Sequence, residues 1–314
     1  MIADDKLTIV IPAYNEATSI GRVVTRTRAT KPLCDIVVVD DGSTDQTAIE
    51  AANAGARVVH HPYNKGNGAA VKSGIRAARG EVVLLLDADG QHSPEDIDRL
   101  LEHIGPYDLV VGARDFSSQA GAHRGFANWA YSTLAGYLVE MKIPDLTSGF
   151  RCFKRDKVME FIHLLPNGYS YPTTTTMSFI KSGYNVKFVP IKVHRRQKGS
   201  KSKIRIWRDG IKFVNIILKM ITLYNPIKMF LPLALIWFVA GFAYGVVNVV
   251  LNGKIPNGAV LLISMSLLIF LFGLISEQIA SLRFERTGLK DNSPPEITSL
   301  ENYQQTTAEV AHRE

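Results

Sequence analysis

Acidic side chains with the spacing of a cation site occur at residues 87–91, in the sequence DADGQ. They follow the apolar run 82–86, which has the composition of a buried strand. Alternate residues beyond a strand point the same way, so Asp87 and Asp89 can converge on one cation. Carboxylate and phosphate oxygens are the ligands that Mg²⁺ or Mn²⁺ prefers, and a metal there neutralises a departing diphosphate. We therefore expect a divalent metal at Asp87 and Asp89 that serves phosphate chemistry.

Two further polar motifs follow earlier apolar runs, IPAYNE at 11–16 and DDGSTD at 40–45. Each has a structural alternative, since Asp-Gly-Ser commonly forms a turn and Asp45 could simply begin a helix. The Asp-x-Asp pattern is also a weak signal when it stands alone. Because the three motifs follow three successive predicted strands, we favour the interpretation that they form one site.

The elements that must position these motifs alternate between strand and helix. Short apolar runs predict strands at Leu7–Ile11, Ile36–Val39, Arg57–His60, Val82–Leu86 and Leu109–Gly112, a short strand after 147–151, and Val186–Val193. Helical segments are predicted near 17–29, 45–54, 67–79, 94–104, 124–140 and 171–182. This alternation predicts an α/β fold with a doubly wound, Rossmann-like sheet. In such sheets ligands lie beyond the carboxyl ends of the strands, where the acidic motifs occur.

The remainder of the chain predicts attachment to a membrane. Segment 204–224 has an apolar stripe with Trp207 and a basic stripe, which is typical of a helix in the membrane interface. The alternative is an ordinary helix packed against the head. Residues 229–251 and 259–275 are uncharged apolar runs, and the first would form about 34 Å of helix, enough to span a bilayer. Lys and Arg flank their outer ends, while the connecting loop holds only Lys254, so both chain ends are predicted to be cytoplasmic.

Four segments are therefore expected. They are a cytoplasmic catalytic domain at 1–203, an amphipathic interface helix and linker at 204–228, a two-helix transmembrane anchor at 229–282, and a polar, disordered tail at 283–314. The first residues show no basic flank followed by an apolar core, so we expect no signal peptide.

Positive charge is concentrated beside the predicted anchor. Ten Lys or Arg and one acid between Lys192 and Lys219 give this segment a net charge of +9, against +7 for the whole chain. Such a block beside a membrane segment favours anionic lipid or a phosphate ligand. Nucleic acid is not favoured as a partner, because no zinc spacing, helix-turn-helix signal or RNA-binding aromatic motif accompanies the block. Cys34 and Cys152 are expected to be buried thiols in a reducing compartment.

The order of the acidic motifs resembles glycosyltransferase family 2, with its GT-A fold, and most closely its dolichol-phosphate mannose synthase and polyprenyl-phosphate glycosyltransferase branch. The resemblance covers about residues 6–205. It implies that Pro12, Tyr14 and Glu16 line the nucleotide pocket and that Asp41 lies near the base or ribose. It also places Asp87, Asp89 and Gln91 at the metal and the diphosphate.

The resemblance further implies a basic lid and an acceptor site. Segment 194–201 resembles the family's mobile loop, with Arg196 and Lys201 closing over the diphosphate. As a bare charge run it would more commonly be a solvated or lipid-facing surface. For the lipid phosphate the matching residues are Arg114, Arg124 and Ser148, with Arg151 as a further candidate, since guanidinium groups bind phosphate through two donors. The alternative for any one arginine is a salt bridge.

The expected reaction is inverting, metal-dependent transfer of a sugar from a UDP- or GDP-linked donor to polyprenyl or dolichyl phosphate. A phosphate acceptor is already anionic near neutral pH, so positioning and charge stabilisation are needed more than a general base. Alternatives are a different membrane lipid or glycan acceptor, or a non-catalytic membrane scaffold. A processive polysaccharide synthase is not favoured, because its Gln-x-x-Arg-Trp element and additional spans are missing from the sequence. The sugar and any assembly into a homo-oligomer are left open.

Overall fold

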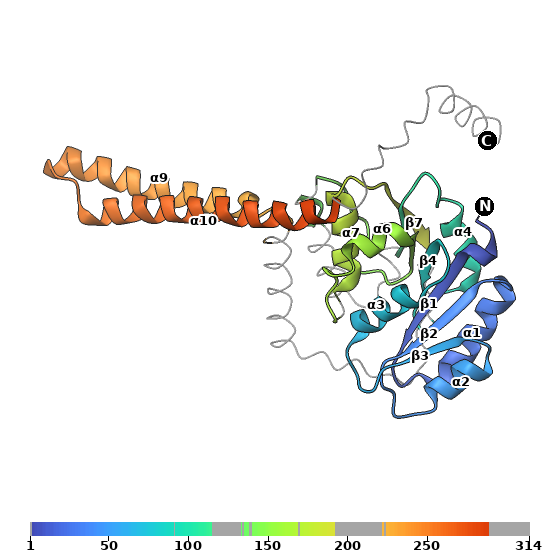
Figure 1. Ribbon diagram of the computed structural model, residues 1–314. Helices are drawn as coiled ribbons and strands as arrows, with labels where there is room; N and C mark the ends of the chain where they lie inside the picture. Colours follow the sequence, from blue (N-terminus) through green and yellow to red (C-terminus); the bar gives the residue numbers. More distant parts are fainter. Residues whose placement is uncertain are drawn as a thin grey trace, which may run out of the picture.

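The chain forms a globular α/β head and a long helical hairpin that projects from it (Figure 1). The computed structural model describes residues 2–90, 92–114, 133, 135–137, 140–168, 170–191, 222 and 224–288, without the side chains of 283–288. The predicted amphipathic segment 204–224 lies outside the described residues except at Thr222 and Tyr224, as does most of the predicted helix 124–140.

The head is built on one seven-stranded sheet with the order β3-β2-β1-β4-β6-β5-β7. The strands are β1 Leu7–Ala13, β2 Asp35–Asp40, β3 Arg57–His60, β4 Val82–Leu85, β5 Leu109–Arg114, β6 Arg151–Lys154 and β7 Val186–Ile191. All neighbours pair in parallel except β6, which lies antiparallel between β4 and β5. The predicted α/β sheet is confirmed, and the antiparallel direction of the interior strand β6 is a feature that the apolar runs did not predict.

Helices cover both faces of the sheet, as a doubly wound fold requires. The described helices of the head are α1 Ala17–Thr30, α2 Thr47–Asn53, α3 Asn67–Ala77, α4 Ile97–Leu101, α6 Arg155–Phe161 and α7 Tyr171–Lys181, with short 3₁₀ turns at Asp4–Lys6 and Pro94–Asp96. Side chains alternate along each strand, so Ile9 and Ile11 of β1 join one core with α1, α2 and α4. Val10 joins the other core with α3, α6 and α7. Both faces are buried, which explains why the strands are continuously apolar.

The strand order places the polar motifs at one edge of the sheet. The order reverses direction at β1 and β4, so the loops after β1, β2 and β4 meet at their carboxyl ends. Strand β6 begins at that same edge, because its first residue, Arg151, pairs with Leu85 of β4 and Val111 of β5. Residues 145–150, which precede β6, therefore join the motifs that follow the parallel strands.

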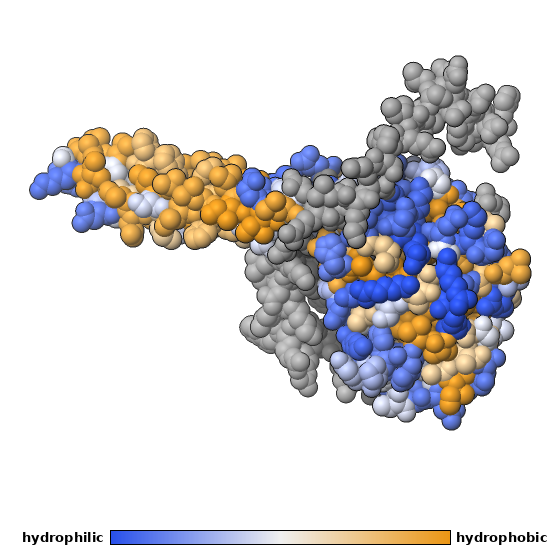
Figure 2. Space-filling model, viewed as in Figure 1, coloured by the Kyte–Doolittle hydropathy of each residue, from blue (hydrophilic) through white to orange (hydrophobic). Residues whose placement is uncertain are grey.

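The hairpin consists of α9 Ile227–Asn252 and α10 Asn257–Gly288. Within segments 227–252 and 257–282, windows of 18 residues have mean hydropathies of 2.1 and 2.6 and are mostly exposed, so both helices are long and apolar enough to cross a membrane. Figure 2 shows apolar surface along the hairpin and hydrophilic residues at its far end, where the helices are joined. Both helices extend beyond the predicted runs, and α10 continues to Gly288, inside the segment predicted as tail.

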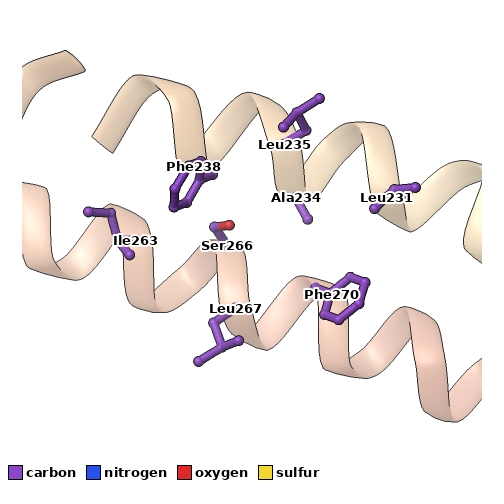
Figure 3. Close-up of a pocket in the computed structure, with 8 residues that line it drawn as sticks. All are labelled: Leu231, Ala234, Leu235, Phe238, Ile263, Ser266, Leu267 and Phe270. Carbon is purple, nitrogen blue, oxygen red and sulfur yellow. The ribbon is translucent and has the colours of Figure 1, made fainter. Parts of the chain in front are cut away.

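The two helices pack closely through small residues. A Cβ added at Gly241 would lie 2.8 Å from the Cβ of Leu262, so only glycine permits this crossing. Nearer the head the helices enclose an apolar groove of about 310 Å³ (Figure 3). Leu231, Phe238 and Phe270 contribute to its lining, and Ser266 supplies its polar atom. This surface suits hydrocarbon rather than water.

The hairpin is joined to the head by specific contacts at its base. Lys228 Nζ donates to the carbonyl of Tyr137 at 3.0 Å and to Glu140 Oε1 at 2.7 Å. Tyr224, which precedes α9, is buried against α7 and its hydroxyl donates to the carbonyl of Thr174 at 2.9 Å. Glu277 Oε2 of α10 accepts the backbone N–H of Ile227 at 3.3 Å, a favourable place for a carboxylate at a helix N-terminus.

Candidate functional site

Asp87 stands at the carboxyl end of β4, where several loops of the head meet. Its side chain is 35% exposed, and His92 Nε2 lies 3.5 Å from its Oδ2. Burial raises the pKa of Asp87, but the hydrogen bond from His92 and the charges of Arg114 and Arg151 outweigh that effect and hold it below the ordinary value. Asp87 is therefore ionised at neutral pH.

The loop before β6 closes against Asp87 at Gly149. A Cβ at Gly149 would lie 2.8 Å from Asp87 Oδ2 and 2.9 Å from Oδ1, so a larger residue cannot occupy this position without displacing the carboxylate. The next residue, Phe150, stacks on the His92 ring with a centroid distance of 5.1 Å. Glycine, phenylalanine and histidine together define the position of the Asp87 side chain.

Arg114 ends β5 beside this carboxylate and is held by Asp145. Its Nε donates to Asp145 Oδ2 at 2.7 Å and its Nη2 to Oδ1 at 3.0 Å, a bidentate pair. Nη2 also donates to Thr147 Oγ1 at 2.7 Å. Asp145 is fully buried, whereas the Arg114 side chain is 29% exposed. Burial lowers the pKa of Arg114, but the hydrogen bond and charge of Asp145 reverse the effect and raise it above the ordinary value.

Ser148 and Arg151, which were predicted to bind the lipid phosphate, are both fully buried. The Ser148 side chain is buried, and its hydroxyl has no hydrogen-bond partner in the described part of the chain. Arg151 is fully buried and donates to the carbonyls of Ser148 and Pro172 and to the Thr176 hydroxyl. Burial lowers the pKa of Arg151 to about 10. The expectation that Arg151 binds the lipid phosphate is therefore wrong. The side chain is fully buried, and its hydrogen bonds join the loop before β6 to α7.

The turn after β1 carries the residues predicted for the nucleotide. Pro12 is buried within β1, Tyr14 is 46% exposed, and Glu16 is half-buried and accepts the Ser19 hydroxyl at 2.8 Å. Asn15 has a φ of 55° and its side-chain oxygen accepts the backbone N–H of Thr44 at 2.9 Å. The first two polar motifs are thus joined to each other, as expected for one site.

Asp41 has both carboxylate oxygens engaged by the loop that follows β3. Oδ1 contacts His61 Nδ1 at 2.6 Å and accepts the N–H of Lys65 at 3.0 Å, while Oδ2 accepts the N–H of Gly66 at 2.8 Å. His61 Nε2 in turn contacts Ser73 Oγ at 2.8 Å. Asp41 therefore shapes the loop 61–66 beside the site.

Asp45 has the structural role that the sequence allowed as an alternative, at the start of a helix. Its carboxylate accepts the N–H of Ala17 at 3.1 Å and that of Thr47 at 3.0 Å, and so bridges the starts of α1 and α2. Burial raises the pKa of Asp45, but the hydrogen bonds from Thr47 and Ala17 bring it below the ordinary value.

A divalent cation fits the chemistry of the β4 end. Asp87 and Asp89 follow the strand together, and the backbone of Gly149 leaves the Asp87 oxygens uncovered by a Cβ. In the described ranges no three His, Cys, Asp or Glu side chains form a complete cage. Mg²⁺ and Mn²⁺ sites of this kind rely on one or two carboxylates and on substrate phosphates, so two carboxylates are a suitable donor set. Gln91, Arg124, Arg196 and Lys201 lie outside the described residues.

Three residues of the site were missing from the sequence-based prediction. His92 stands directly after the DADGQ motif, and its position there was an available signal. Asp145 precedes Thr147 and Ser148 in the chain, but nothing in the pattern paired it with Arg114. His61 follows β3 and could not be connected to Asp41 without the strand order.

Comparison with known proteins agrees with this architecture. Residues 8–161 match the family Glycosyl transferase family 2, and residues 225–282 match the GtrB C-terminal hairpin. The undecaprenyl-phosphate mannosyltransferase of Micrococcus luteus is 31% identical over 204 residues, which are 60% of this chain and 84% of the relative. The polyprenol monophosphomannose synthase of Mycolicibacterium smegmatis is 34% identical over 213 residues, which are 61% of this chain and 78% of the relative.

A solved structure supports the fold. Glucosyl-3-phosphoglycerate synthase of Mycobacterium tuberculosis, in complex with Mn²⁺, UDP and glucosyl-3-phosphoglycerate, superposes with a TM-score of 0.55 at 21% identity. The match covers 69% of this chain and 78% of that protein, and at this identity it shows the GT-A fold alone. The sequence matches carry the assignment further, and the chain therefore belongs to glycosyltransferase family 2.

Proposed function

We propose that this glycosyltransferase moves a sugar from a UDP- or GDP-linked donor to a polyprenyl or dolichyl phosphate at the cytoplasmic face of a membrane. The observation that carries the proposal is the joining of two features in one chain. An ionised Asp87 and a clamped Arg114 lie at one edge of the sheet, and an apolar hairpin is fastened to the same head through Lys228 and Tyr224. Polyprenyl-phosphate relatives among the sequence matches support this acceptor class.

The donor is assigned to the edge formed by the loops after β1, β2 and β4. Tyr14 is exposed there, Pro12 and Glu16 shape the turn, and Asp41 holds the neighbouring loop 61–66. A bound Mg²⁺ or Mn²⁺ would be held by Asp87 and Asp89, with Gln91 next to them in sequence, and would neutralise charge on the diphosphate. Arg196 and Lys201 of the predicted basic loop are proposed to close over that diphosphate.

The acceptor is assigned to Arg114, with Arg124 and Ser148 as further members of the same side. Arg114 Nη1 has no hydrogen-bond partner among the described residues, so the guanidinium keeps donors for a phosphate oxygen. Because lipid phosphate is anionic near neutral pH, orientation by Arg114 replaces the work of a general base.

The reaction is a single displacement at the anomeric carbon. An oxygen of the lipid phosphate forms the new bond to that carbon as its bond to the donor diphosphate breaks, and the nucleoside diphosphate leaves with the electron pair. The configuration at the anomeric carbon is inverted, because attack occurs opposite the leaving group.

Full-length protein in lipid nanodiscs containing polyprenyl phosphate tests this proposal. A panel of UDP- and GDP-sugars is supplied, and the released nucleoside diphosphate, the lipid product and its anomeric configuration are measured, with and without EDTA. We expect one donor class to yield an inverted sugar phosphodiester of the lipid, with activity lost in EDTA. Transfer to a hydroxyl lipid or glycan in place of polyprenyl phosphate would overturn the acceptor assignment.

A further inference from the structure

The carboxylate of Asp145 is fully buried at the carboxyl end of β5 and is surrounded by donors. Oδ2 accepts from the Arg114 side chain at 2.7 Å and from the Arg114 backbone N–H at 3.2 Å. Oδ1 accepts from Arg114 Nη2 at 3.0 Å, from the backbone N–H of Thr147 at 3.0 Å and from the Thr147 hydroxyl at 3.2 Å. Such a buried acceptor is stable only while these donors stay in place.

This arrangement determines the orientation of the Arg114 side chain. Two parallel hydrogen bonds fix the plane of the guanidinium, and the Thr147 hydroxyl holds Nη2 from a second direction at 2.7 Å. The remaining nitrogen, Nη1, has no hydrogen-bond partner among the described residues and can donate to a ligand. Since lysine has a single flexible ammonium group, it could not be oriented in this way.

The site around the pair points to an anionic ligand. Arg114 ends β5 and Asp87 follows β4, and these two strands run to the same edge of the sheet on either side of β6. The Ser148 hydroxyl, a buried polar atom without a partner among the described residues, belongs to the same loop as Thr147.

We propose that Asp145 is a positioning residue for the acceptor phosphate, acting through Arg114, whose guanidinium it orients with the assistance of Thr147. The inference rests on the proposed function of Arg114. The sequence allowed two interpretations of Arg114, a salt bridge or a phosphate contact. Here both apply, because the salt bridge to Asp145 orients Arg114 for the phosphate. Asp145 itself touches neither substrate.

A double-mutant cycle in nanodiscs tests this role. The variants are Asp145→Asn, Arg114→Ala and their combination, and the KM for polyprenyl phosphate, kcat and the Kd for nucleotide are measured. Asparagine keeps the size of the side chain. Its NH₂ group, however, is a donor, and it would replace one of the two oxygens that accept hydrogen bonds from Arg114 and Thr147. The matched control is Asp108→Asn, since Asp108 forms an ion pair with Lys154 at 2.9 Å at the opposite end of β5.

We expect Asp145→Asn to raise the acceptor KM about ten- to a hundredfold, the loss for a misplaced charge-assisted contact, with nucleotide Kd changed by less than about twofold. In the Arg114→Ala background the same change should add less than about threefold, because coupled residues are not additive. Asp108→Asn should leave the acceptor KM unchanged.

Other outcomes separate the two assignments. If Arg114→Ala raises the acceptor KM but Asp145→Asn does not, or if the two losses are fully additive, the positioning role is overturned while the proposed function stands. If Arg114→Ala leaves the acceptor KM unchanged, the acceptor assignment itself fails, and the positioning role fails with it.

If Asp145→Asn does not fold, Thr147→Val provides the second test, because it removes only the hydroxyl that holds Arg114 Nη2 and Asp145 Oδ1. It should raise the acceptor KM in the wild-type background and not in Arg114→Ala. An equal effect in both backgrounds overturns the role.

Discussion

At the scale of single residues, the side chains that we propose to meet substrate are more exposed than those that hold them in place. Asp87 and Arg114 are partly exposed, whereas Asp145 and Arg151 are fully buried and satisfied within the head. Burial of a charge is tolerated here because each buried group has several hydrogen-bond partners. Substitution of the partly exposed members is therefore expected to cost the fold less stability than substitution of the buried ones.

Asp89→Ala is expected to abolish transfer and leave the fold nearly intact. Asp89 follows the end of β4 and is half-buried, so its removal costs little stability. Loss of a metal ligand forfeits leaving-group stabilisation of several kcal/mol, about a thousandfold in rate. Product formation and thermal unfolding measure the two effects, with the exposed Glu102→Ala as control. Near-normal turnover, with or without added Mn²⁺, would exclude the metal assignment.

Arg114→Ala is expected to weaken use of the acceptor more than binding of the donor. The efficiency with polyprenyl phosphate should fall about ten- to a hundredfold, since a charge-assisted contact to phosphate is lost. Nucleotide titration without lipid should change little. The opposite pattern, weak nucleotide binding with normal dependence on lipid, would place Arg114 on the diphosphate.

At the scale of elements, the loop before β6 links the proposed donor and acceptor sides. It carries Asp145 and Ser148 and brings Gly149 against the Asp87 carboxylate, because β6 starts at the carboxyl edge of the sheet. Its position is secured by Arg151, which fastens the loop to α7.

Gly149→Ala is expected to impair catalysis at little cost to stability. The added Cβ would lie 2.8 Å from Asp87 Oδ2, so the carboxylate must move from the end of β4. We expect at least about a tenfold loss of kcat, since small misplacements in an active site are costly. Gly168→Ala is the matched control, because no atom lies within 4 Å of its added Cβ. Equal activity of the two variants would show that Asp87 tolerates displacement.

The cysteines report on the integrity of the sheet. Burial raises the pKa of Cys34 to about 11 and that of Cys152, in the interior strand β6, further still. A raised pKa means less thiolate at a given pH, so a soluble thiol reagent at about pH 8 should label neither residue until the head is unfolded. Labelling of Cys34 should increase first as the pH approaches 11. Rapid labelling of Cys152 in the folded protein would indicate that β6 opens.

At the scale of the whole molecule, the protein combines a water-soluble head with a hairpin that suits a lipid environment (Figures 1 and 2). The hairpin helices are exposed along most of their length, so they are not the core of the head. Contacts at Lys228 and Tyr224 join the two parts, and they would hold the site at a defined height above a membrane.

Truncation after Pro226 is expected to leave a head that binds nucleotide but uses long-chain lipid poorly. The cut retains Tyr224, which is buried against α7, and removes α9 and α10. Without the anchor the effective concentration of bilayer lipid falls, and a loss on the order of a hundredfold is expected. The truncated head and the full-length protein should use a soluble short-chain polyprenyl phosphate equally well. Equal use of bilayer lipid by both proteins would make the anchor dispensable.

The amino-acid sequence by itself predicted the seven strands and the described helices except α6, although β1 continues through Pro12 to Ala13, beyond its predicted end at Ile11. Short continuous apolar runs of four to six residues indicate buried strands, and their alternation with helices indicates a sheet covered on both faces. Parallel strands bring their carboxyl ends to one edge, so the motifs after β1, β2 and β4 could be assigned to one site in advance. Two uncharged runs likewise predicted the hairpin, because a bilayer sets the length of an apolar helix.

Only the tertiary structure decided which charged groups meet. The antiparallel β6, inserted between β4 and β5, brings Asp145 to Arg114 although 31 residues separate them in the chain. It also buries Arg151, which the sequence presents as another arginine beside Ser148. Local patterns report burial and periodicity, but the pairing of charges depends on strand order, which is chosen by the packing of the whole sheet.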